Sequence, residues 1–113
     1  MSRPIIKLPR AEKDLIGYYA YLGDERSIET ADRFLDAVDR TLALIAKSPG
    51  IGAPHQTSNP RLAGLRSLPV SKFKRYLLSY QTFDDRIELV RVLHGARDIG
   101  RILSASANGD DDE

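Results

Sequence analysis

The residues of this chain that could bind or catalyse are the basic side chains of its second half. Residues 60–109 hold nine Lys or Arg and four Asp or Glu, whereas residues 1–59 hold eight of each sign and are neutral. The candidate set consists of Arg66, Lys72, Lys74, Arg75, Arg91, His94, Arg97 and Arg101. Because the arginine fork binds carboxylate and phosphate through paired hydrogen bonds, this set predicts a surface that recognises an acidic protein or a nucleic acid.

The same residues have a second interpretation, in which they form an ordinary solvated surface of mixed charge. Arg97 and Asp98 are neighbours that could form a local ion pair, and such surface pairs signify little. His94 would then be a partly buried histidine without a chemical role. Residue types alone leave both interpretations open.

Other kinds of site are excluded or disfavoured by residue type. The chain has no Cys, which excludes a disulfide, a thiol nucleophile and a Cys-ligated metal. The two histidines, His55 and His94, are far apart in sequence, so no metal or other cofactor is expected. No serine lies in a nucleophile elbow, and no glycine-rich phosphate loop precedes a helix. The four acidic residues 110–113 are interpreted as solvating rather than metal-binding.

The first half of the chain predicts a short strand and then a helix. An apolar run of β character spans residues 4–8, and Pro9 suits the first turn of the helix that follows. Apolar residues then recur about one turn apart as far as Leu22. Gly23-Asp24 predicts the end of this helix, because glycine readily takes the left-handed cap conformation.

A second helix is the clearest element of the sequence. Ser27 is a good N-cap, and an apolar stripe runs from Ala31 to Ala46 opposite a charged face. Ser48-Pro49-Gly50 ends the helix. The two helices are separated by about four residues, so they are expected to form an antiparallel hairpin.

The second half predicts a sheet. Residues 50–61 are turn-rich and are expected to form a loop, and strands are predicted at 62–70, 74–83 and 86–94, the last two joined at Asp84-Asp85. Apolar residues fall on both faces, which is typical of central strands that helices cover on one side and that are partly covered on the other. The expected fold is therefore α+β, with an N-terminal strand, an antiparallel helical hairpin and a three-stranded antiparallel meander (β-α-α-β-β-β).

The length of 113 residues favours a single domain, expected at residues 1–103, followed by an acidic tail at 104–113 that is expected to be disordered. No apolar run approaches the roughly 20 residues of a membrane span, and the N-terminus has no signal-peptide core. A cytoplasmic protein without a membrane partner is the expectation.

Four segments of the chain resemble a known family. Residues 11–15 read Ala-Glu-Lys-Asp-Leu, similar to the family's A-E-x-D-L helix start, and residues 65–70 and 75–80 also match. The most specific segment is Arg-Val-Leu-His-Gly-Ala-Arg-Asp-Ile at 91–99. Over residues 4–103 the chain resembles toxins of the ParE/RelE superfamily, the toxic half of bacterial type II toxin–antitoxin pairs, and its last segment is typical of the ParE branch. One departure is Leu8, where the family usually has Ser or Thr before the helical proline.

The resemblance to the ParE branch implies growth inhibition by binding rather than by catalysis. Such toxins bind DNA gyrase, with the A subunit the expected contact, trap it in a DNA-cleaved state, and meet nucleic acid only through it. A ParD-like antitoxin would neutralise the toxin by laying an acidic segment across the groove between helical hairpin and sheet. The eight basic residues would contact antitoxin or target, and charge reversal at Arg75 or Arg91 is expected to weaken antitoxin binding well over tenfold.

Two alternatives remain open at this point. A RelE-like toxin would be an endoribonuclease that cuts messenger RNA on the ribosome, with His94, Arg97, Lys72 and Arg75 as its catalytic residues. Many nucleases of the family have a tyrosine after the last strand, but all five tyrosines here precede residue 81, which disfavours this activity. The other alternative is a homologue without toxicity that only binds an antitoxin. The binding hypothesis requires that the arginines of the sheet are not occupied by contacts within the chain.

Overall fold

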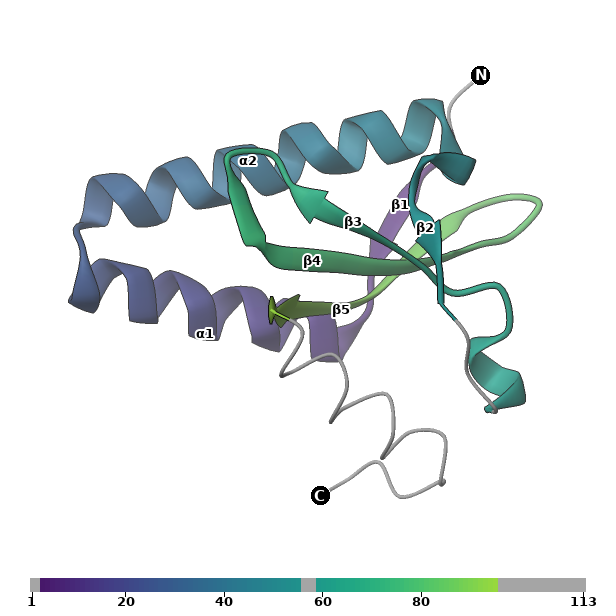
Figure 1. The fold of residues 1–113 in the computed structure, drawn as a ribbon, viewed down its shortest axis with the longest axis horizontal. Coiled ribbons are helices and arrows are strands. Elements are labelled where there is room, and N and C mark those ends of the chain that lie inside the picture. The colour runs from purple at the N-terminus through teal and green to yellow at the C-terminus, as the bar shows by residue number, and fades with distance from the viewer. Residues whose placement is uncertain (1–2, 56–58, 96–113) are drawn as a thin grey trace.

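Two helices lie along one face of a five-stranded sheet (Figure 1). The computed structural model describes residues 3–55 and 59–95. Its elements are β1 (Ile5–Lys7), α1 (Pro9–Glu25), α2 (Ile28–Lys47), η1 (Pro49–Ile51), β2 (Ala53–Pro54), η2 (Pro60–Leu62), β3 (Arg66–Val70), β4 (Phe73–Thr82) and β5 (Ile87–His94), where η is a 3₁₀ helix. This order confirms the predicted α+β fold with its helical hairpin and β3–β4–β5 meander.

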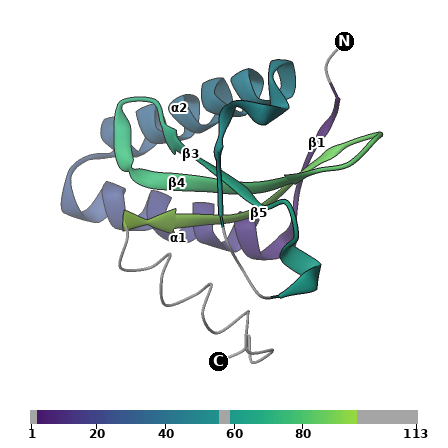
Figure 2. The same ribbon diagram turned by 45° about the vertical axis from the view of Figure 1, so that its right-hand side comes forward.

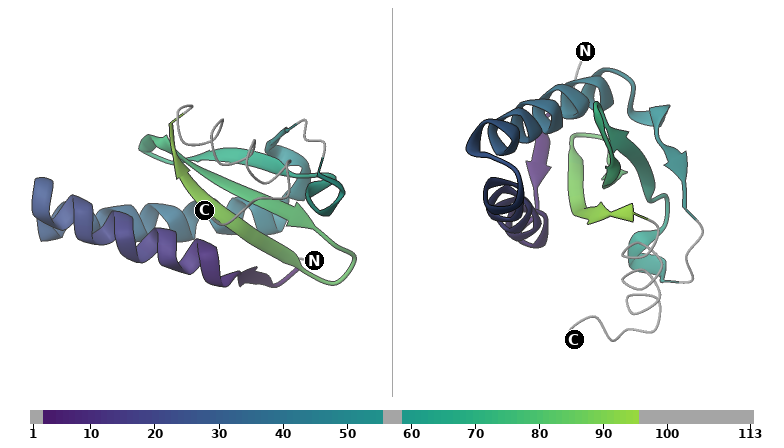
Figure 3. Two further views of the ribbon diagram at one scale, coloured as in Figure 1. Left: turned by 90° about the horizontal axis from the view of Figure 1, so that it is seen from below. Right: turned by 60° about the vertical axis from the view of Figure 1, so that its left-hand side comes forward.

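The strands form one mixed sheet in the order β1-β5-β4-β3-β2. Strand β1 pairs in parallel with β5, and the remaining neighbours are antiparallel. The N-terminal strand β1 therefore forms one edge of the sheet, beside β5. Helix α1 follows β1 almost directly in the chain. Seen from below, the helices and the meander form two separate layers (Figure 3).

The helical hairpin differs from the prediction at its connection. Helix α1 continues past Gly23 to Glu25, and the backbone N–H groups of Arg26 and Ser27 both donate to Leu22 O. Gly23 has no positive φ and does not cap the helix. The Ser27 hydroxyl accepts from Thr30 N at 3.0 Å, as the N-cap assignment predicts. Only two residues separate the helices, which fixes them side by side.

The predicted loop over residues 50–61 is partly regular. It contains the end of η1, the short strand β2 and the start of η2. Strand β2 pairs with Ser67 and Arg66 of β3 and so adds a fifth strand at the far edge of the sheet. A two-residue strand carries no periodicity, which is why the sequence could not predict it.

Apolar residues of both layers meet in one core. Phe34 of α2 is fully buried, and the centroid of its ring lies 4.9 Å from the ring centroid of Tyr76 in β4. Leu78 and Val92, which are register partners on β4 and β5, are also fully buried in this core. Leu65 and Leu93 are buried as well but lie outside the cluster under the helices, consistent with the prediction of apolar residues on both faces. No helix among the described residues is long and apolar enough to cross a membrane.

Candidate binding surface

Three of the predicted basic residues lie together on the β3–β4 hairpin and are exposed. Val70 pairs with Phe73, so Ser71 and Lys72 form a two-residue turn, and Lys74 and Arg75 follow at the start of β4. Within the described ranges, no side chain of Lys72, Lys74 or Arg75 is engaged in an ion pair or hydrogen bond. We call these three residues the basic hairpin. Their charges are available to an anionic partner.

Helix α2 holds this hairpin in place. Thr41 is buried in α2, where its hydroxyl donates to Ala37 O at 2.8 Å and accepts from Ser71 N at 3.0 Å. Lys72, the next residue, has a φ of 68°, a left-handed conformation that glycine adopts without cost but that a side chain disfavours. The turn is thus anchored at Ser71 by the hydrogen bond to Thr41, and its backbone is strained at Lys72.

This strain allows a charge to be removed from the basic hairpin without loss of stability. We expect Lys72→Gly to raise the free energy of unfolding by about 1 kcal/mol, because glycine relieves the left-handed φ. Urea denaturation followed by circular dichroism measures the change. Lys74→Gly is the matched control: it lies in strand β4, where glycine should cost about 0.5–1 kcal/mol. A loss of stability in Lys72→Gly comparable to that in Lys74→Gly would contradict the strain.

Arg91, by contrast, is occupied within the chain. Its guanidinium donates to Asp14 of α1 through Nε at 2.8 Å and Nη2 at 3.0 Å, and the Val92 N–H donates to the same carboxylate at 2.9 Å. Both side chains are mostly buried, at 14% and 13% exposed. Strand β1 pairs with β5 only as far as Leu89, so Asp14 covers the edge of β5 beyond that point. Arg91 therefore fastens β5 to α1.

Arg66 is also satisfied by nearby backbone. Its Nη1 donates to Gly52 O at 2.7 Å and lies 3.4 Å from Gly50 O. Tyr80 holds the same segment, because its hydroxyl donates to Pro49 O and accepts from Gly52 N, each at 2.8 Å. Burial raises the pKa of Tyr80, so its phenol stays protonated. Arg66 thus holds the segment that follows α2, residues 50–52, against the sheet.

A glycine is required where this segment crosses the sheet. A Cβ added to Gly52 would lie 2.6 Å from the Tyr80 hydroxyl oxygen and 2.8 Å from the carbonyl oxygen of Ser67. The second of these contacts is with backbone, which cannot rotate away. The close approach at Gly52 therefore fixes the position of the carbonyls that Arg66 binds.

His94 lies beside the start of β4, on the side of the sheet that the helices cover. Its ring packs edge-on against Tyr76, with centroids 4.8 Å apart, and Tyr76 packs in the same manner against Tyr18 of α1 at 4.9 Å. Arg75 precedes Tyr76 on β4, and by strand alternation it lies on the opposite face. His94 and Arg75 are neighbours along the sheet but point to different sides of it.

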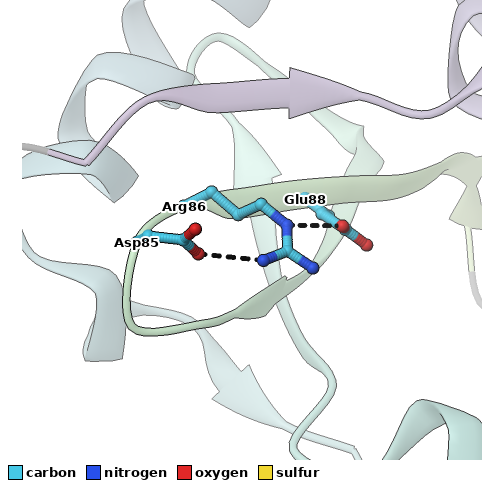
Figure 4. A network of polar contacts seen from close by, with 3 residues as sticks. All are labelled: Asp85, Arg86 and Glu88. Carbon is cyan, nitrogen blue, oxygen red and sulfur yellow. Dashed lines mark hydrogen bonds and ion pairs between the residues drawn. The ribbon is translucent and has the colours of Figure 1, made fainter.

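The acidic loop between β4 and β5 contrasts with the basic hairpin. Arg86 there donates to Glu88 and Asp85 at 2.8 and 2.9 Å (Figure 4), and its guanidinium lies 4.3 Å from the ring centroid of Phe83. The two carboxylates raise the pKa of Arg86. This loop and the basic hairpin are at opposite ends of β4 (Figure 2). Among the described candidate residues, the cations without a partner therefore lie at the hairpin end of β4.

The eight candidates accordingly divide into groups. Lys72, Lys74 and Arg75 make no ion pair or hydrogen bond with another described residue. Arg66 and Arg91 are occupied, contrary to the expectation that the arginines of the sheet are unoccupied, and His94 lines a pocket. Arg97 and Arg101 lie outside the described residues, as does the predicted tail.

The sequence alone did not identify Asp14 as the partner of Arg91. A signal existed, because Asp14 lies one helical turn from Ala11 and Tyr18 beside the apolar stripe, where a carboxylate needs a partner.

The architecture is one that a solved toxin–antitoxin structure shares. A chain of the chromosomal ParDE TA system from P. aeruginosa superposes with a TM-score of 0.68 at 15% sequence identity, over 83% of this chain and 97% of that chain. This likeness defines the class, an α+β domain with a ParE-like fold. No curated protein sequence matches the chain.

The sequence itself gives the family. The family model of the ParE toxin of the type II toxin–antitoxin system, parDE, matches residues 5–99. The chain belongs to this family, as the segments around residues 11–15 and 91–99 indicate.

Proposed function

We propose that this protein inhibits growth by binding DNA gyrase, through its A subunit, and that a ParD-like antitoxin neutralises it. The observation that carries the proposal is the ParE family match over residues 5–99. Poisoning gyrase requires a surface that binds one state of the enzyme better than another, and no bond in the partner needs to be broken by the toxin. The free cations of the basic hairpin suit such a contact.

The charges of the basic hairpin also support an acidic antitoxin. Lys72, Lys74 and Arg75 project from one end of the sheet with no carboxylate among the described residues to neutralise them. An acidic segment that crossed this end would gain both association rate and specificity from the charges. The structural neighbour comes from a ParDE system, which agrees with a partner of this kind.

A supercoiling assay tests the gyrase proposal. Purified protein added to gyrase, relaxed plasmid and ATP should stop supercoiling and leave plasmid cleaved after protein denaturation, because the toxin holds the cleaved state. The antitoxin encoded beside the gene, added first, should restore supercoiling. Topoisomerase I in place of gyrase is the control and should be unaffected. Undiminished supercoiling at a large molar excess of the protein would refute the gyrase target.

The nuclease alternative predicts a different outcome. His94 packs on Tyr76 on the helix-covered side, whereas Arg75 lies on the other face, so these two candidates do not converge on one phosphate. Cleavage of ribosome-bound messenger RNA in phase with codons, lost in His94→Ala, would favour that alternative. Intact messenger RNA together with inhibited gyrase supports the proposal.

A further inference from the structure

A pocket of about 440 Å³ opens between α1 and the adjoining ends of β4 and β5. Its lining residues are Lys13, Asp14, Gly17, Tyr18, Tyr21, Tyr76 and His94. Four of these seven residues carry flat rings, and the Tyr76 ring packs edge-on against the rings of Tyr18 and His94. The volume is within the range of about 300–1,000 Å³ that ligand sites occupy. Ring walls of this kind favour a planar aromatic guest, because edge-to-face contacts add to apolar burial.

The charge of the pocket is positive. The Asp14 carboxylate is neutralised by Arg91 and also accepts from the Val92 N–H, so it presents no net charge to a guest. Lys13 is exposed at the rim and makes no ion pair with another described residue. Tyr76 remains a neutral phenol, since burial raises its pKa. A partner group that carries an aromatic ring next to a carboxylate therefore matches the aromatic lining of the pocket and the ammonium group of Lys13.

Gly17 leaves this space open. It lies inside α1, where glycine is unfavourable compared with alanine, yet an added Cβ would meet no atom of the described residues within 4 Å. Packing among the residues that the structure describes therefore gives no reason for glycine at this position. A partner group that approaches the helix backbone closely would require a glycine, because any side chain at residue 17 would enter the pocket.

We propose that this pocket receives an aromatic side chain of the antitoxin's acidic segment, with a neighbouring carboxylate of that segment on Lys13. The proposal rests on the proposed function for the existence of the antitoxin, and adds the residue type that anchors it. The pocket lies beside β5, whose edge Asp14 covers, so the guest would also contact the part of α1 that the Arg91 pair fixes.

Filling the pocket tests the proposal without damaging the fold. Gly17→Gln places a good helix former in open space, so thermal stability should be equal or higher. Affinity for the antitoxin encoded beside the gene, measured by calorimetry, should fall about tenfold or more. The control is Ala43→Gln, the same side chain on an exposed position of α2, which should change affinity less than about twofold. Equal affinities of the two variants would overturn the pocket proposal while leaving antitoxin binding intact.

A second measurement does not depend on the antitoxin. In a ¹⁵N-correlated NMR titration, indole-3-acetate should shift the amides of Gly17, Tyr21 and His94, and more strongly than either cyclohexylacetate or the neutral indole-3-acetamide. Lys13→Gln should abolish the difference between the acid and its amide. Absence of these shifts, or tighter binding of adenosine 5′-monophosphate than of indole-3-acetate, would overturn the proposal. If the antitoxin itself failed to bind, the proposed function would fail, whereas this titration would still decide the chemistry of the pocket.

Discussion

Asp14→Ala is expected to lower the free energy of unfolding by about 3 kcal/mol. The carboxylate accepts two hydrogen bonds from Arg91 and one from the Val92 N–H, at 2.8 to 3.0 Å. Its removal would leave a guanidinium that is only 14% exposed and a strand-edge N–H without partners. Removing one partner of a buried pair costs about 3–5 kcal/mol, and the remaining exposure of this pair places it at the lower end.

Urea denaturation of Asp14→Ala and a matched variant measures the effect. Asp39→Ala is the matched change, because Asp39 is 71% exposed and its ion pair with Lys7 is long, at 3.8 Å. An exposed pair of this kind contributes about 0–1 kcal/mol, so Asp39→Ala should be nearly neutral. Two equally small losses would show that the Asp14 carboxylate does not hold β5. The double variant Asp14→Ala/Arg91→Ala should lose less than the sum of the single losses, since the two residues share one interaction.

The fold was predictable to the extent that it rests on local periodicity. The apolar stripe of α2 and the Ser27 cap are signals contained in one segment, and both are confirmed. The parallel pairing of β1 with β5 joins residues about eighty positions apart, and nothing in either segment encodes it. The Gly23 prediction was wrong because the cap depends on where the next helix begins, and Ser27 begins it two residues after Glu25.

The charge of the candidate site was predictable from the sequence, but the partners that its arginines contact were not. The sequence located the excess of cations in residues 60–109, and the basic hairpin lies within that range. Whether an arginine is free depends on contacts distant in sequence: Asp14 occupies Arg91 across 77 positions, and the carbonyl of Gly52 occupies Arg66 across 14. The pocket was missed because its rings come from α1, β4 and β5, where each reads as part of an apolar pattern.

Charge reversal of the basic hairpin is expected to have the largest effect on antitoxin binding. Lys74→Glu combined with Arg75→Glu should weaken the antitoxin complex by about a hundredfold at moderate salt, because both side chains are exposed and unpaired among the described residues. Arg91→Glu is not suited to this test. It would set a second carboxylate against Asp14 and lower stability, so a lost complex would not report on binding.

The controls for this double variant are position and salt. Arg61→Glu introduces a glutamate at an exposed position in η2, which lies away from the basic hairpin (Figure 1), and should weaken binding less than about threefold. The difference between native and doubly reversed protein should shrink as salt rises from about 0.1 to 1 M, since the screening length falls from about 10 to 3 Å. A hundredfold loss that persisted in high salt would point to damaged packing rather than lost charge. A double variant that bound as tightly as the native protein at low salt would remove the basic hairpin from the antitoxin interface.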